Sequence, residues 1–295
     1  MINKVKTEQP LHTFKLTHLP KLLIKTYKAW MEKEPFKLGA VVAYYAILSL
    51  PALLILILNL VGAIWGRDIV RGELQSELST ALGSDTATAI LKMIAEKGDQ
   101  PTSIFATILG IGVLLYGATG VFYQLQNVLD TIWDIKPVYS NEIISTLIGR
   151  LKSFGFILIF GFLLLISFAL TALLTAFSNR ISTLFSTEIV EFAYVIDITL
   201  SLIFIYFLFA AMFKFLPSKP IQWKAVRVGA ALTALLFILG KYVLSFYFGE
   251  TEPGSTYGAA GSIIIVMLWT SYSSLILFFG AQFTKIYSDS YLTIN

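Results

Sequence analysis

Six stretches of the sequence are long enough and apolar enough to cross a membrane as helices. They span residues 39–65, 103–129, 151–177, 193–216, 228–248 and 260–284. A hydrocarbon core about 30 Å thick is crossed by roughly 20 apolar residues in a helix. Backbone groups in lipid must hydrogen-bond within their own segment, and the runs lack the alternating period of a barrel strand. The sequence therefore predicts an all-α integral membrane protein with six transmembrane helices.

The charge content excludes the soluble classes of protein. Only 14% of the residues are charged, against about 25% in an ordinary soluble protein, and 56% are hydrophobic.

The chain has no cysteine, and its two histidines, His12 and His18, precede the first apolar run. These counts exclude a disulfide, a His/Cys metal cluster and a Ser-His-Asp triad, and there is no phosphate loop ending in Lys-Ser or Lys-Thr. We expect no enzyme activity, catalytic residue, metal, cofactor or nucleic-acid partner.

Positive charge predicts the orientation, because Lys and Arg concentrate in cytoplasmic loops. With the N-terminus inside, the inside segments carry sixteen Lys and Arg and the outside segments carry five. Both termini are therefore predicted to be cytoplasmic. We expect one membrane domain over 1–295, with a cytoplasmic amphipathic segment at 1–38, a six-helix bundle at 39–287 and a cytoplasmic tail at 288–295. The polar start of the chain argues against a cleaved signal peptide.

Two segments outside these runs are amphipathic. In 19–30, LPKLLIKTYKAW, Lys21, Lys25 and Lys28 lie off a helix face formed by Leu19, Leu22, Leu23, Tyr27 and Trp30. This helix either lies on an anionic membrane surface or packs on the protein's own cytoplasmic side. The stretch 67–100 predicts a short helical extracellular insertion after the first span, with a break at Gly83. It is either a lid over an external opening or a packed hairpin.

The first span contains a proline, in the stretch AYYAILSLPALLILIL at 43–58. A proline inside a helix removes one hydrogen bond and costs about 3 kcal/mol. Ser49, Tyr44 and Tyr45 lie within two turns of Pro51 and are candidates to satisfy the freed carbonyl. We expect a kinked helix with Ser49 and the tyrosine pair facing the bundle interior. The kink is either a hinge or substrate-lining break, or a static kink that lets the helices pack.

Two short stretches of the sequence are similar, YGATG at 116–120 and YGAAG at 257–261. Small residues let helix backbones approach closely, so helix packing is predicted at Gly117, Gly120, Gly258 and Gly261. Three interpretations are open. The stretches reflect an internal duplication, they pack against each other, or each marks a loosened helix.

Polar residues interrupt the helix at 122–134, FYQLQNVLDTIWD. Asn127, Asp130 and Asp134 are three and four residues apart, so they share a face, and Gln124 is a further polar residue of the segment. The segment is either a polar patch at the inner mouth of a cavity or a helix end that meets lipid headgroups.

Two further polar residues lie within predicted spans. Lys241 is a basic residue well inside the fifth run. It is either a functional intramembrane charge or a side chain that snorkels to the outer interface. Gln282 adds polar atoms to the last span.

Three blocks of sequence carry a family resemblance. They are PFKLGAVVAYYAILSLPALL at 35–54, GATGVFYQLQNVLDTIW at 117–133 and GAAGSIIIVMLWTSYSSLILFFGAQFTKIY at 258–287. Together they resemble the YihY/BrkB family of bacterial inner-membrane proteins, formerly mislabelled ribonuclease BN. The resemblance covers about 20–287 and implies a six-span protein of the bacterial cytoplasmic membrane, of unsettled biochemistry, with members linked loosely to envelope lipid export.

The chain departs from the family pattern at two positions. It has Asp130 where many members have Asn, and Gln282 where many have Glu. A neutral amide cannot carry a proton, so a proton relay through Gln282 is not expected. Ribonuclease activity is not expected either, because the cytoplasmic loops are short and show no acidic cluster for paired metals.

Two functions remain open from the sequence. Transport or flipping of an envelope lipid or amphiphile predicts a cavity near the midplane lined by Tyr44, Tyr45, Ser49, Gln124, Asn127 and Lys241. A non-catalytic scaffold or envelope-assembly protein without cargo predicts a closed, dry bundle. An intramembrane lipid enzyme would need Lys241 paired with a carboxylate. Membrane lipids are expected partners, and the oligomeric state stays open.

Overall fold

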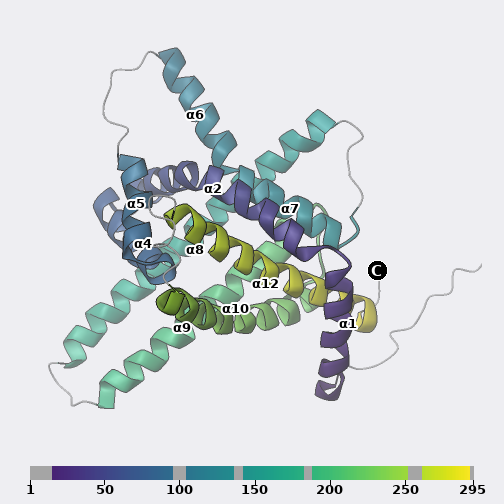
Figure 1. The fold of residues 1–295 in the computed structure, drawn as a ribbon. Helices are drawn as coiled ribbons and strands as arrows, with labels where there is room; N and C mark the ends of the chain where they lie inside the picture. The colour runs from purple at the N-terminus through teal and green to yellow at the C-terminus, as the bar shows by residue number, and fades with distance from the viewer. Residues whose placement is uncertain (1–14, 96–103, 136–141, 183–187, 252–260, 293–295) are drawn as a thin grey trace, which may run out of the picture.

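The regular elements of the chain are helices throughout the part that the structure describes. This computed structural model describes residues 15–95, 104–135, 142–182, 188–251 and 261–292 (Figure 1). A 3-10 turn at Leu16–His18 precedes the α-helices. These are α1 Leu19–Met31, α2 Pro35–Leu60, α3 Gly62–Trp65, α4 Arg67–Leu82, α5 Ser84–Ala95, α6 Ile104–Ala118, α7 Gly120–Ile132, α8 Glu142–Ser182, α9 Glu188–Phe215, α10 Trp223–Thr251 and α12 Gly261–Tyr291.

Four helical segments within the described ranges are long and apolar enough to cross a membrane. They are Pro35–Trp65, Ile143–Leu163, Trp223–Phe248 and Gly261–Tyr291, and Ser201–Phe215 is a shorter apolar helix. The all-helical class and a multi-span membrane chain are thus confirmed. The count of six spans and the cytoplasmic placement of both termini stay predictions.

The second predicted span, 103–129, is divided in the structure. α6 ends at Ala118, Thr119 lies between the two helices, and α7 begins at Gly120, inside the YGATG stretch. The third helix also differs from prediction, because α8 begins at Glu142 rather than near 151. Arg150, expected in a cytoplasmic loop, therefore lies inside the candidate span Ile143–Leu163.

α12 lies at the centre of the bundle, with α2 packed on one side and α10 on the other (Figure 1). The α10–α12 crossing is close because each helix offers a glycine to a threonine of its partner. A β-carbon added at Gly229 would lie 1.7 Å from Thr284 Oγ1, and one added at Gly280 would lie 1.8 Å from Thr233 Oγ1. Each threonine donates to the carbonyl oxygen of the glycine on its own helix, at 2.7 Å for Thr233 and 2.6 Å for Thr284. Small residues at a crossing are the usual device for close helix packing in membranes.

The predicted insertion after the first span forms a packed helical hairpin. α4 and α5 are separated by Gly83, whose φ of 87° lies in the region that favours glycine. Leu74 and Leu82 are buried and Leu78 is partly buried, in one cluster with side chains near the ends of α2 and α12. This packing agrees with the packed-hairpin alternative.

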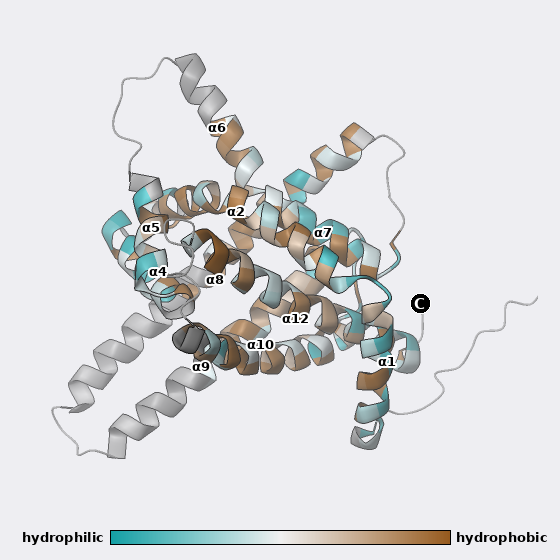
Figure 2. Cartoon of the chain, in the orientation of Figure 1, coloured by the Kyte–Doolittle hydropathy of each residue, from teal (hydrophilic) through white to brown (hydrophobic). Residues whose placement is uncertain are grey.

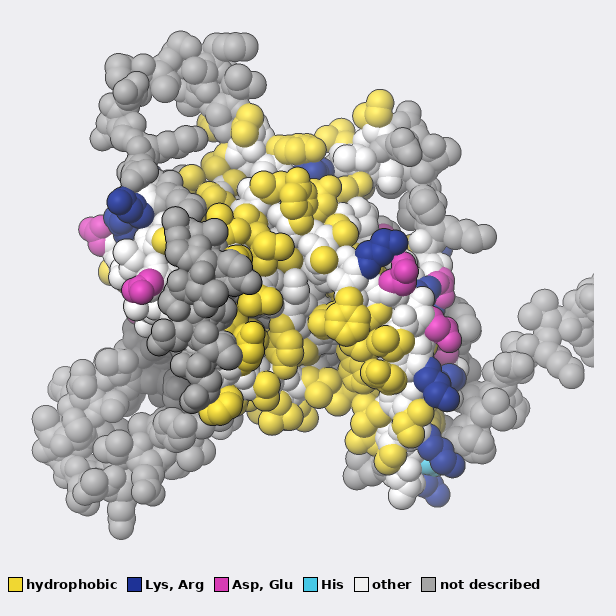
Figure 3. Space-filling model, in the orientation of Figure 1, with side chains coloured by type: hydrophobic (Ala, Val, Ile, Leu, Met, Phe, Trp, Pro, Cys, Tyr) yellow, Lys and Arg dark blue, Asp and Glu magenta, His cyan; other side chains and the backbone are white. Residues whose placement is uncertain are grey.

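The surface shows an apolar band between two charged ends. In Figure 3, apolar side chains cover the middle of the visible face, and Lys, Arg, Asp and Glu gather at its two ends. Figure 2 shows the same division along the chain, with mostly apolar residues on α2, α10 and α12 and many hydrophilic ones on α4 and α1. A band of this kind is typical of a membrane-spanning bundle, since charged side chains are costly in hydrocarbon.

The N-terminal helix α1 packs on the end of α12, and the chain turns sharply into α2 at Glu34, whose φ is 50°. Leu22 is buried in a cluster with Phe283 and Ile286 of α12, and Trp30 contacts Phe279 edge-on at 5.7 Å between ring centroids. The predicted apolar face thus contacts the protein itself, except for Tyr27, which is 54% exposed. Tyr27 lies at the edge of this face, with its ring centroid 6.0 Å from that of Trp30.

Candidate functional site

The break between α6 and α7 lies directly against the proline-containing helix α2. A β-carbon at Gly117 would lie 3.2 Å from Ala52 Cβ, and one at Gly120 would lie 2.7 Å from Ser49 Oγ. Gly117 and Gly120 are therefore packing positions, but their partner is α2. Gly258 lies outside the described residues, and Gly261 is the buried first residue of α12. The first stretch is thus both closely packed and a helix break.

Arg150 of α8 reaches this helix break. Its Nη1 donates to the Tyr116 carbonyl oxygen at 2.5 Å and to Thr119 Oγ1 at 3.2 Å. Its guanidinium carbon lies 3.8 Å from the centroid of the Tyr116 ring and 5.2 Å from that of Tyr123. Such cation–π geometry stabilises a cation that is partly removed from water.

Gly149 lets α8 approach closely enough for these contacts. A β-carbon at Gly149 would lie 2.5 Å from Tyr123 Cε2. The hydroxyl of buried Ser153 donates to the Gly149 carbonyl oxygen at 2.9 Å, one turn further along α8. The absent side chain at 149 therefore places Arg150 at the level of Thr119.

A groove of about 780 Å³ opens between the α6–α7 break and α8. Its lining is mostly apolar, with Arg150 as the charged member: Leu115, Tyr116, Thr119, Ile143, Thr146, Leu147, Arg150, Leu151 and Phe154. Ile143, Leu147 and Leu151 repeat at four-residue intervals on α8 and are 78%, 69% and 68% exposed. Their exposure leaves the outer wall of the groove open to the surroundings in the described part of the chain.

The hydrogen-bond inventory of Arg150 is incomplete. A guanidinium has five N–H donors, and the two recorded bonds both use Nη1. Nε is buried without an acceptor, and among the described residues no carboxylate pairs with Arg150. The groove thus joins an apolar wall to a cation that has no counter-ion among the described residues, which suits a ligand with an acyl chain and an acidic group.

The six side chains expected to line a midplane cavity do not line this groove. Ser49 is buried against Gly120, and Tyr45 contacts the same position. Tyr44 is 58% exposed, so the expectation that both tyrosines face the interior is wrong for Tyr44. Pro51 does not end the helix, since α2 continues from Pro35 to Leu60.

The two other residues of that set on α7 also lie apart from the groove. Gln124 is partly exposed and Asn127 is exposed. The backbone carbonyl oxygen of Asn127 accepts a hydrogen bond from Thr131 Oγ1 at 2.8 Å, one turn further along α7.

Neither Lys241 of α10 nor Gln282 of α12 lines the groove. Lys241 is partly exposed. The acidic residues that could pair with it, Glu191, Asp197 and Glu250, have side chains outside the described set. Gln282 is 3% exposed, and its buried Oε1 has no hydrogen-bond partner among the described residues. Gln282 is therefore an interior residue of the bundle.

Asp130 joins α7 to the turn between α9 and α10. Its carboxylate accepts from the backbone N–H of Ser218 at 2.8 Å and from the Ser218 hydroxyl, and Gln126 Nε2 donates to Ser218 Oγ at 3.2 Å. Burial raises the pKa of Asp130 above its usual value, and the hydrogen bonds from Ser218 act in the opposite direction. This contact fixes the turn and lies away from the groove residues.

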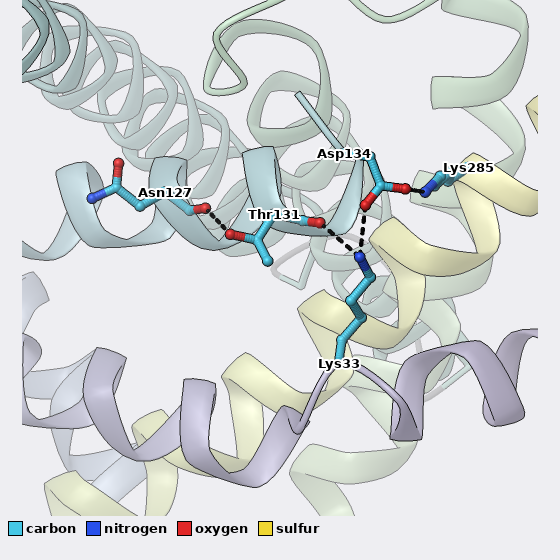
Figure 4. Close-up of polar contacts among 5 residues, drawn as sticks. All are labelled: Lys33, Asn127, Thr131, Asp134 and Lys285. Carbon is cyan, nitrogen blue, oxygen red and sulfur yellow. Dashed lines mark hydrogen bonds and ion pairs between the residues drawn. The ribbon is translucent and has the colours of Figure 1, made fainter. Parts of the chain in front are cut away.

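Asp134 forms a separate ion-pair node (Figure 4). It lies beyond the end of α7 with φ of 51°, so it does not share a helix face with Asp130, contrary to expectation. Its carboxylate pairs with Lys285 of α12 and, at 2.7 Å, with Lys33 of the α1–α2 turn. Lys33 also donates to the Thr131 carbonyl oxygen at 3.2 Å. The hydrogen bonds from Lys285 and then Lys33 lower the pKa of Asp134 to about 2.

Among the described side chains there is no group of three or more His, Asp or Glu placed to hold a metal ion. The sequence analysis missed Arg150, Tyr116 and Thr119 as a unit. A usable signal was present, because Ile143, Leu147 and Leu151 extend the apolar face of the helix upstream of 151 and around Arg150.

The fold and the surface define a multi-helix integral membrane protein with a lateral apolar groove. The model of the family described as Virulence factor BrkB matches residues 26–293. The chain belongs to this family, as the resemblance of the three sequence blocks predicted.

Curated relatives carry the name UPF0761 membrane protein. The chain is 24% identical to one from Mannheimia succiniciproducens over 279 residues, covering 93% of this chain and 92% of the relative. It is 24% identical to one from Haemophilus influenzae over 260 residues, covering 87% and 91%. A shorter match to one from Tolumonas auensis is 37% identical over 76 residues, covering 25% of this chain and 24% of the relative. No solved structure is significantly similar to the chain. These names agree with a membrane protein and assign it no activity.

Proposed function

We propose that this protein binds and translocates an amphiphile of the bacterial inner membrane, with the acyl part in the α6–α8 groove and an acidic group on Arg150. The observation that carries the proposal is the guanidinium of Arg150, which lies in a wall of apolar side chains and has no carboxylate partner among the described residues. An intramembrane charge is expensive and marks function by default. A lipid or lipid-like molecule fits both features, because its acyl chain would cover the exposed apolar side chains and its acidic headgroup would pair with Arg150.

The helix break beside the groove supports movement rather than mere binding. Tyr116 and Thr119, which bind Arg150, stand at the α6–α7 break, and this break packs on Ser49 of α2. Interrupted helices whose ends meet a substrate are a recurring feature of transporters. A rotation of α6 about Thr119 would move the backbone carbonyl and the ring of Tyr116, which together position Arg150.

The second candidate is a non-catalytic scaffold, and the packed interior favours it. Phe213 and Phe278 are 0% exposed and Leu129 is 0% exposed, all in the main core cluster. Side chains of this size fill the bundle, as expected for a closed, dry structure. A scaffold would leave the groove to ordinary bulk lipid.

The test measures both binding and movement in reconstituted protein. Proteoliposomes containing a fluorescent phosphatidylglycerol are treated with dithionite, which bleaches only the outer leaflet, and lipids retained by the protein are identified by native mass spectrometry. We expect bleaching beyond the outer leaflet, and a retained acidic amphiphile enriched over bulk lipid. Losing a charge-assisted contact worth roughly 1.5–3 kcal/mol should weaken retention in Arg150→Gln by about 10- to 150-fold.

The matched control is Arg227→Gln, the same substitution at an exposed arginine of α10 outside the groove. It should behave as the wild type. Only bulk lipid in every sample, with bleaching confined to the outer leaflet, would overturn the proposal and favour the scaffold. Retention without movement would limit the proposal to amphiphile binding and contradict its transport part.

A further inference from the structure

α1 carries a second apolar stripe that the bundle does not cover. Ile24, Tyr27 and Met31 are spaced three and four residues apart and are 59%, 54% and 41% exposed. Phe36, at the start of α2, is 61% exposed. The stripe is distinct from the face that packs on α12, which contains Leu22 and the fully buried Thr26.

Three lysines form a third stripe on the same helix. Lys21, Lys25 and Lys28 are exposed and spaced four and three residues apart. At about 100° per residue, the centre of the lysine stripe lies roughly 90° around the helix from the centre of the exposed apolar stripe. α1 therefore has three faces: one packs on the protein, one is apolar and is left exposed by the described residues, and one is basic and exposed.

The direction of α1 places these faces at a membrane surface. α1 runs across the ends of α2 and α12 and extends beyond the bundle (Figure 1). In Figure 3 its apolar side chains lie on the edge toward the apolar band, and its lysines lie on the opposite edge. A helix that crosses the end of a membrane-spanning bundle lies parallel to the membrane, so its apolar edge meets lipid and its basic edge meets headgroups and water.

The attachment of α1 to the bundle holds this orientation. The turn between α1 and α2 is short, with Glu34 in the left-handed region and Pro35 as the first residue of α2. Lys33, in this turn, binds Asp134, which also binds Lys285 of α12. α1 is thus fixed to three elements at its C-terminal end, α2, α7 and α12, and Leu22 also packs its N-terminal half on α12.

We infer that α1 is an interfacial helix that binds the anionic phospholipid surface of the membrane, with Ile24, Tyr27 and Met31 in the acyl–headgroup boundary and Lys21, Lys25 and Lys28 on acidic headgroups. Charge complementarity commits this surface to anionic lipid. A basic patch beside an apolar stripe attracts acidic headgroups, whereas a second copy of α1 would bring the same lysines together. The inference is independent of the groove and of the proposed transport.

The absence of cysteine from the chain makes the test direct. Single spin labels are introduced as Ile24→Cys, Tyr27→Cys, Lys21→Cys and Lys25→Cys in the full chain, reconstituted in nanodiscs of phosphatidylcholine with or without phosphatidylglycerol. Collision rates with oxygen, which enriches in lipid, and with a water-soluble nickel chelate are then compared. In phosphatidylglycerol discs we expect oxygen to dominate at 24 and 27 and nickel to dominate at 21 and 25.

Two variants test the charge requirement at the Tyr27→Cys label. Replacing Lys21, Lys25 and Lys28 together by Gln should raise nickel access at 27 severalfold in phosphatidylglycerol discs. Replacing the same three by Arg keeps the charge and should leave nickel access low. Nickel access at 24 and 27 equal to that at 25 in the unaltered helix would overturn the inference. So would protection of 24 and 27 from both reagents, which would mean that a protein covers the stripe.

Discussion

Ser49 of α2 and Gly120 of α7 are in contact, with Ser49 Oγ 2.7 Å from the position of a β-carbon at Gly120. This distance is shorter than real β-carbon contacts, so the hydroxyl occupies space that only glycine leaves open. The contact joins the proline-containing helix to the break in the α6–α7 pair. It therefore connects the packed interior to the helix end that binds Arg150.

Gly120→Ala should lower stability by about 1–3 kcal/mol, the usual cost of overpacking. Thermal unfolding in detergent, followed by size-exclusion chromatography, measures the change. Adding Ser49→Ala should recover most of the loss, because the hydroxyl is the atom in contact. Gly112→Ala is the control, since a β-carbon there meets nothing within 4 Å and helix propensity favours Ala. Equal losses for both single glycine variants would contradict the packing explanation.

Gly280→Ala should destabilise the protein more than Gly120→Ala does. The new β-carbon would meet Thr233 Oγ1 at 1.8 Å and Thr233 Cβ at 2.9 Å, so part of the obstruction is close to the backbone. Thr233→Ala in the same chain should recover only part of the loss, because the β-carbon of residue 233 remains. The apparent melting temperature checks both variants. A Gly280→Ala protein that melts with the wild type would show that α10 and α12 do not cross this closely.

Tyr116→Phe should keep the groove competent for its ligand, whereas Tyr116→Leu should not. Arg150 uses the aromatic face and the backbone carbonyl of Tyr116, and neither interaction needs the phenolic hydroxyl. The Leu variant removes the aromatic ring, and with it a cation–π interaction worth about 0.5–2 kcal/mol. Native mass spectrometry of retained amphiphile compares the two variants. Equal weakening of retention in both would indicate that the hydroxyl, not the ring, is required.

The stabilising effect of Asp134 should disappear in acid. Its folded-state pKa is lowered to about 2 by Lys285 and Lys33, so the stabilisation is present above the unfolded value of about 4 and is lost as the pH falls toward 2. The melting-temperature difference between wild type and Asp134→Asn should shrink over that window. At neutral pH, high salt should also reduce it, because the side chain is 62% exposed. A difference independent of pH and salt would contradict the ion-pair explanation.

Asp130 should show the opposite pH dependence. Burial raises the pKa of this carboxyl, so its ionised form is disfavoured in the folded state and the cost is relieved as the pH falls through the raised pKa. Asp130→Asn retains an oxygen that can accept from Ser218, and it should be tolerated or stabilising at neutral pH. Thermal unfolding of both proteins across the acidic range gives the measurement. Strong destabilisation by Asn at neutral pH would show that the carboxylate charge is needed.

The location of the helices was predictable because hydropathy is a local property. Four of the six predicted runs correspond to candidate spans, and the break at Gly83 falls where the sequence placed it. The division at Thr119 was harder to predict, because YGATG lies within a continuous apolar run whose hydropathy does not change there. Packing on the protein and lying on a membrane surface were not exclusive alternatives for 19–30. One face of α1 packs on the bundle, and another face is exposed.

The sequence alone determined the class of the protein, because long uncharged runs have no stable place outside a bilayer and their backbones must be helical there. Only the tertiary structure decided the candidate site. Arg150 and Tyr116 are 34 positions apart, and they meet because Gly149 lets α8 approach Tyr123 of α7. A contact between two helices depends on their crossing point and rotation, which many side chains set together. No single residue type in the sequence encodes that crossing, so the groove appears only once the helices are packed.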